Sequence, residues 1–224
     1  MSKTPGDHAL AVVKAALNVV PLLGGAIASL IGDYIPTATQ RTINRALSDL
    51  ASQLQRLQDR IDPSNIDSDQ FSELFKSAYL IMVRTHDERR LHAAVRLLAN
   101  ILLKQRDPEK ISYTELDHYA RCLEFLSVGA IEVLAHAVAS AKLTNPGDLD
   151  ARSTRLDFSQ LQERVPQMSP SLLMGLIGEL DAMNLIHRLG APTVRTPDYA
   201  NYPLELTPIG AKFTRQILEL ETAV

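Results

Sequence analysis

The sequence has few cysteines, few aromatic residues and no excess of basic residues, and several classes of protein require one or more of these. It has a single cysteine, Cys122, which excludes an internal disulfide framework and a multi-cysteine zinc site. It has no tryptophan and only 5% aromatic residues. Basic residues are not in excess, because 23 Lys and Arg stand against 26 Asp and Glu and give a formal charge of −3. The chain therefore has no overall attraction to phosphates or acidic lipids, and we expect a reducing, cytoplasmic setting.

What is present is a globular composition. The 224 residues are 46% apolar and 22% charged, which excludes collagen-like, mucin-like and broadly disordered chains. This length allows one large or two small folding units, each able to bury a core without disulfides.

Residues 15–32 form a run without charge between Lys14 and Asp33. Its length is at the lower limit for a membrane-spanning helix, and Pro21 would kink such a helix. We therefore favour a buried, broken helix within a segment of residues 1–36. A membrane-engaging segment, peripheral at the inner membrane, is the alternative. In either case the apolar positions are Val19, Val20, Leu22, Leu23, Ile27, Leu30 and Ile31.

Residues 37–127 have the pattern of a helical bundle. Apolar residues at spacings of three and four predict one long helix over residues 38–61. The apolar residues form a seam along one face of this helix, and that face must be buried against another helix or against a second copy of the chain. We expect the seam to mediate oligomerisation. Its members are Ile43, Leu47, Leu50, Leu54, Leu57 and Ile61. Three further helix starts are indicated by the pairs Asp67 with Gln70, Thr85 with Glu88, and Ser112 with Glu115.

Beyond a turn-rich stretch at residues 144–148, the pattern changes within a unit that we place at residues 128–224. We expect a mainly α protein whose C-terminal unit is a winged-helix-like domain with a small β-hairpin wing. The predicted order is a helix at 128–142, an extended piece at 155–157, helices at 158–165 and 169–184, strands at 185–189 and 202–206, and a helix starting at Thr207. The predicted inward residues of the helix at 169–184 are Leu172, Leu173, Leu176, Ile177, Leu180 and Met183.

Several segments are similar to known families. Leu-Thr-Pro-Ile-Gly-Ala-Lys-Phe at residues 206–213 and the hairpin at residues 176–188 resemble winged-helix domains. Residues 75–220 resemble the abortive-infection alpha family of bacterial defence proteins, through the Leu-Ser and Glu-Val-Leu of residues 126–134 and the Leu-Thr-x-x-Gly-x-x-Phe close. This second resemblance implies a non-enzymatic protein linked to phage exclusion and carries over no functional residue.

The charges on the predicted winged helix argue against DNA as its first partner. The helix at residues 169–184 contains no Lys or Arg but does contain Glu179 and Asp181. Phosphate contacts require cations, and base edges are read by Arg, Lys, Asn or Gln. We therefore expect a protein-docking face formed by Ser171, Met174, Gly175, Gly178 and Ala182.

A DNA-binding regulator, dimeric through the helix at residues 38–61, is the alternative function. Candidate anion contacts for nucleic acid or lipid are Arg89, Arg90, Arg96, Arg188 and Arg195. The partner that we expect first is another protein or a second copy of this chain.

No catalytic pattern or cofactor site is evident. Glu115 and His118 have the Glu-x-x-His spacing of di-iron bundles, but the second copy that such sites need is missing. His86 and His92, near the start of a predicted helix, are better explained as solvated or capping residues. His118 lies one turn from Cys122 but no third group completes a nucleophilic site. The sequence also lacks P-loop and Gly-x-Ser-x-Gly motifs. We expect no enzyme activity, no metal and no cofactor.

Overall fold

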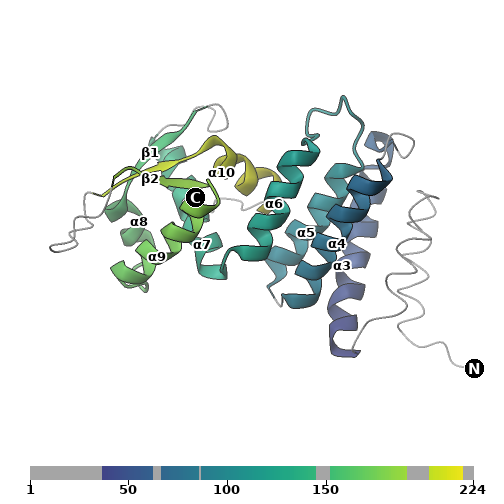
Figure 1. The fold of residues 1–224 in the computed structure, drawn as a ribbon, viewed down its shortest axis with the longest axis horizontal. Helices are drawn as coiled ribbons and strands as arrows, with labels where there is room; N and C mark the ends of the chain where they lie inside the picture. Colours follow the sequence, from purple (N-terminus) through teal and green to yellow (C-terminus); the bar gives the residue numbers. More distant parts are fainter. Residues whose placement is uncertain (1–36, 63–66, 86, 145–151, 191–201, 219–224) are drawn as a thin grey trace, which may run out of the picture. The chain divides into compact units, whose positions relative to one another are not determined.

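The computed structural model describes residues 37–62, 67–85, 87–144, 152–190 and 202–218. It divides into two compact units, Met1–Glu124 and Phe125–Val224, which are described separately below. The described residues are mainly helical, and their strands form one small antiparallel sheet (Figure 1).

The first unit is helical in its described part. Helices α3 (Thr37–Arg56), α4 (Ser68–Arg84) and α5 (Glu88–Ile101) pack against one another, and α6 (Tyr113–Phe125) follows after a loop (Figure 1). Two polar contacts join α6 to α4. The Tyr113 hydroxyl donates to Glu73 at 2.7 Å, and Arg84 pairs with Glu124 at 3.2 Å.

The predicted long helix ends earlier than expected. Helix α3 stops at Arg56, and the 3₁₀ turn η1 (Gln58–Arg60) follows it. Ile61 is extended and forms an isolated antiparallel bridge with Leu103, so it does not continue a helical seam. The expectation for the end of this helix was wrong because pairing with a distant strand-like segment replaces the last helical turn.

Residues of the predicted seam are buried inside the first unit. Leu50 and Leu54 are only 3% and 4% exposed on a helix that packs against α4 and α5. Leu57 is half-buried, Ile61 is buried, and the side chains of Ile43 and Leu47 lie outside the described residues. The oligomer interpretation therefore fails for Leu50, Leu54 and Ile61, whose surfaces are already covered by their own unit.

Two of the three predicted helix starts are confirmed. Asp67 caps α4 by accepting the N–H groups of Asp69 and Gln70. At the start of α6, the Ser112 hydroxyl accepts the Glu115 N–H at 3.3 Å while the Glu115 carboxylate accepts the Ser112 N–H at 3.4 Å.

The third start, Thr85 with Glu88, was wrong. Asp87 caps α5 by accepting the Arg90 N–H at 3.0 Å, whereas Thr85 ends α4. The Thr85 hydroxyl accepts the Asp87 N–H at 3.1 Å and so fixes the turn between the two helices.

The second unit contains a short sheet among helices. Its elements are α7 (Val128–Thr144), β1 (Thr154–Asp157), α8 (Phe158–Arg164), α9 (Pro170–Ala182), β2 (Ile186–Arg188), β3 (Pro203–Leu206), α10 (Pro208–Phe213) and the π-helical turn η3 (Thr214–Leu218). The strand order is β1-β3-β2, and both pairings are antiparallel. Helix α7 packs against α8, α9, β1 and β3, so the core of this unit surrounds α7.

The Leu-Thr-x-x-Gly-x-x-Phe segment has a structural explanation. Leu206 and Phe213 are buried, at 1% and 0% exposure. The Thr207 hydroxyl accepts the Gly210 N–H and donates to the carbonyl oxygens of Asn184 and Leu185. A Cβ added at Gly210 would clash with the Leu185 backbone. The motif therefore joins β3 and α10 to the end of α9.

The orientation of α9 differs from the expectation at two positions. Leu172 was expected to point inward but is 53% exposed, and Met174 was expected to point outward but is only 8% exposed. The buried face is defined by Leu173, Ile177 and Leu180, and Met174 lies one turn before Ile177 on that side. Leu172 belongs to the first turn, on the side that the described residues leave open.

No helix in the described ranges combines the length and the apolar character needed to cross a membrane. The uncharged run at residues 15–32, with its seven apolar core-or-membrane positions, lies outside those ranges.

Candidate functional site

The exposed face of α9 is the site that sequence analysis singled out. Ser171, Gly175 and Ala182 are exposed and Gly178 is half-buried, while Leu172 takes the outward place expected of Met174. A Cβ added at Gly175 would meet no atom within 4 Å. This face, which we call the α9 face, has no ionisable side chain of its own and is open to close approach at Gly175. The guanidinium of Arg188 borders it, because a Cβ added at Gly178 would lie 3.9 Å from Arg188 Nη1.

The two carboxylates of α9 serve the unit itself. Glu179 accepts the backbone N–H of Ser127 at 2.8 Å, just before α7 begins. Asp181 accepts a bond of 2.8 Å from Arg188 Nε, and His187 Nδ1 lies 3.4 Å away. Burial alone would raise the pKa of Asp181, but the bonds from Arg188 and His187 outweigh burial and lower it. These groups position α9 against α7 and β2.

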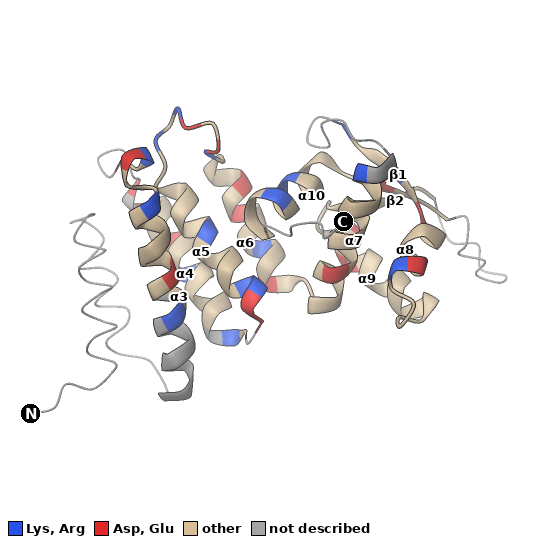
Figure 2. Ribbon diagram, turned by 180° about the vertical axis from the view of Figure 1, so that it is seen from behind, with Lys and Arg blue, Asp and Glu red and all other residues tan. Residues whose placement is uncertain are grey.

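Among the described residues, the candidate anion contacts do not form a free basic patch within either unit. Arg188 is paired with Asp181, and Arg195 lies outside the described residues. Arg89 is exposed, whereas Arg90 and Arg96 are half-buried. Desolvation, followed by repulsion from Arg56, lowers the pKa of Arg96. Figure 2 shows basic and acidic positions interspersed along the helices of each unit.

Polar side-chain contacts connect α3 and α5. Arg45 pairs with Glu88 at 2.8 Å, and Asp49 lies 3.4 Å from His92. All four side chains are more than a third exposed, so these pairs contribute little to stability. His92 is thus placed beside a single carboxylate, and His86 lies outside the described residues.

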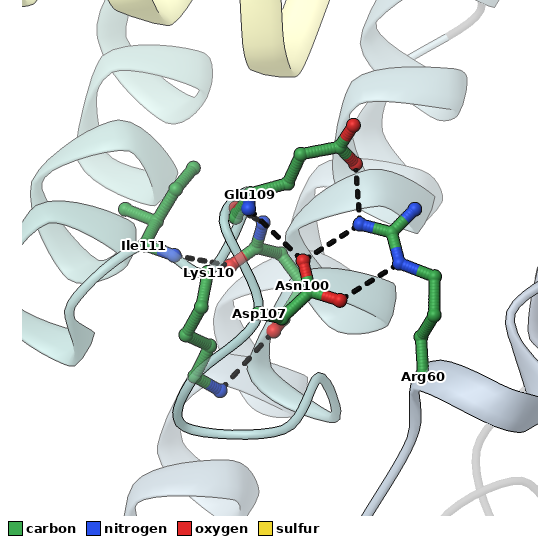
Figure 3. Close-up of polar contacts among 6 residues, drawn as sticks. All are labelled: Arg60, Asn100, Asp107, Glu109, Lys110 and Ile111. Atoms are coloured by element: carbon green, nitrogen blue, oxygen red, sulfur yellow. Dashed lines mark hydrogen bonds and ion pairs between the residues drawn. The ribbon is translucent and has the colours of Figure 1, made fainter.

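Sequence reasoning missed a well-connected polar cluster at residues 102–112 between α5 and α6, a segment that we call the α5–α6 loop. Figure 3 shows Arg60 reaching this loop from η1. Its Nε and Nη2 atoms donate to the two oxygens of Asp107 at 2.7 and 2.6 Å, and Nη2 also donates to Glu109 at 2.8 Å. This geometry raises the pKa of Arg60 and holds the pKa of Asp107 below its usual value.

Two more side chains hold the same loop against α5. Asn100 donates to the Glu109 carbonyl at 2.8 Å and accepts the Ile111 N–H at 2.9 Å (Figure 3). Lys110 Nζ donates to the carbonyls of Asn100 and Ile101, at 3.2 and 2.6 Å, where α5 ends. Desolvation lowers the pKa of Lys110. The loop is thus fixed by contacts of five side chains whose only sequence signal was the Asp107-Pro108 break.

Candidate metal and cysteine chemistry finds no support in the geometry. Among the described residues no group of three or more His, Cys, Asp or Glu side chains is placed to hold a metal ion. Cys122 is fully buried, with its Sγ atom 3.6 Å from His118 Nε2. Desolvation raises the pKa of this thiol to about 12, so its nucleophilic thiolate is scarcely populated at neutral pH.

Comparison of the chain with protein-family models, curated proteins and solved structures finds no match.

Proposed function

We propose that the C-terminal unit is a winged-helix domain that binds another protein through the α9 face. The order of its elements from α7 to α10 supports this fold, as does the pairing of β2 with β3 beside β1. In such a domain α9 takes the place of the helix that enters the major groove of DNA, and the β2–β3 hairpin takes the place of the wing.

The observation that carries the proposal is the electrostatic character of α9. The helix has no cation, and the guanidinium of Arg188, on the adjacent strand, is bound to Asp181. DNA binding depends on cations that neutralise phosphates and on side chains that read base edges. The side chains of the α9 face supply neither, and Arg188, which borders the face at Gly178, is held through its Nε atom by Asp181. A surface without ionisable side chains loses little solvation when a protein covers it.

The shape of the α9 face indicates the kind of partner. Leu172 offers an exposed apolar side chain, and Gly175 allows the partner to approach the helix backbone closely. A protein surface with an apolar recess fits these features. The recess would receive Leu172, and the partner would need no charged groups at the centre of the contact.

The resemblance to the abortive-infection alpha family suggests that this docking takes place in bacterial phage defence. In that setting the chain is a non-enzymatic protein of bacterial phage defence, and the protein that it binds controls its action. A membrane role for residues 15–32 remains the alternative, and Arg89 and Arg90 would then strengthen attachment to anionic lipid. Phage plating on cells that produce the wild type or Leu172→Asp tests the setting, and we expect only the wild type to reduce plaque numbers.

Photo-crosslinking tests the docking itself. A photoreactive amino acid placed at Ser171 should give a protein adduct in cells, and Leu172→Asp should abolish it because the charge cannot enter an apolar recess. The matched control is Leu189→Asp, which changes another exposed leucine outside α9 and should leave the adduct intact. Sedimentation of the purified chain reports whether the partner is a second copy.

DNA binding is measured in parallel, by anisotropy of labelled duplexes across salt concentrations. Because counterions are released on phosphate binding, a DNA-binding protein loses affinity steeply as salt rises. We expect no such dependence. A steep salt dependence, or a Ser171 adduct that survives Leu172→Asp, would contradict the proposal.

A further inference from the structure

We draw no further inference here: the strongest candidate, the apolar surface at the start of the second unit where Phe125 and Val128 are 65% and 49% exposed, carries none because nothing in the described residues shows what covers it.

Discussion

The side chain of Asp107 is 6% exposed, and both of its oxygens accept hydrogen bonds from Arg60, a residue 47 positions earlier in the chain. The bidentate form of this contact orients both planar groups and connects the end of α3 with the α5–α6 loop. A carboxyl placed in this way is sensitive to protonation, because the neutral acid cannot accept both charge-assisted bonds.

The stability of the chain should therefore respond to acid through Asp107. The pKa of Asp107 is lowered in the folded state, relative to about 3.9 in an unfolded chain. Its contribution is thus fully present above that value and is lost as pH falls through the folded-state pKa. In urea unfolding from pH 7 to pH 2.5, Asp107→Asn should have a lower midpoint than the wild type at pH 7.

The difference between these two midpoints should narrow as the pH falls, since an increasing fraction of the wild-type carboxyl is then protonated and neutral. Asp69→Asn, a change of an exposed aspartate, is the control and should follow the wild type. A constant difference at every pH would show that Asp107 acts through packing rather than charge.

Cys122 gives a second prediction for a single residue. Its side chain is fully buried and the pKa of the thiol is raised to about 12, so neither access nor ionisation favours reaction. Ellman's reagent at pH 8 should modify the native chain very slowly. In denaturant it should modify one thiol per chain, matching the single cysteine of the sequence. Rapid reaction of the native protein would mean that the α6 core opens readily.

At the scale of elements, two glycines in helices of the same unit should respond oppositely to the same change. Gly210→Ala places a Cβ against the Leu185 backbone, which cannot move without separating α10 from the end of α9. We expect a loss of about 1–3 kcal/mol in the free energy of unfolding, as for overpacked cores. Gly175→Ala meets open space and should stabilise the chain by about 0.5–1 kcal/mol, because alanine loses less backbone entropy.

Urea unfolding of the two variants measures both effects on one scale. Equal destabilisation by the two substitutions would contradict the close packing of Gly210 and the openness of the α9 face.

The ends of the helices show which parts of a helix are determined by residues close together in the sequence. Asp67 and Ser112 were identified from short capping patterns, because a side chain that bonds to a backbone N–H three residues away needs no distant partner. The end of α3 was not identified from the sequence, because Ile61 lies outside the helix and pairs with Leu103. The apolar period continues through Ile61, so nothing in the local pattern marks this change.

At the scale of the whole molecule, the apolar segment at residues 15–32 distinguishes two modes of action. Its uncharged length is marginal for a bilayer, so we expect it to belong to the core of the first unit. Deletion of residues 1–36 should then lower the thermal midpoint, and the full chain should remain in the supernatant when vesicles with or without anionic lipid are sedimented. Pelleting that is lost on deletion would instead support the membrane-engaging alternative.

The amino-acid sequence by itself determined the local structure of this protein. The apolar periods, the capping residues and the Pro-containing turns predicted the mainly helical composition, the short strands around residues 186 and 204, and the start of α10 at Thr207. These features depend on residues within a few positions of one another, so one sequence is enough to identify them.

Only the tertiary structure decided which surfaces remain available. It covered the predicted oligomer seam at Leu50 and Leu54, and it exposed Leu172 in place of Met174. It also bound Arg188 to Asp181 and joined Arg60 to Asp107. A periodic pattern shows that a face is apolar but not what covers it. Whether a charge is free likewise depends on a partner brought close by the fold.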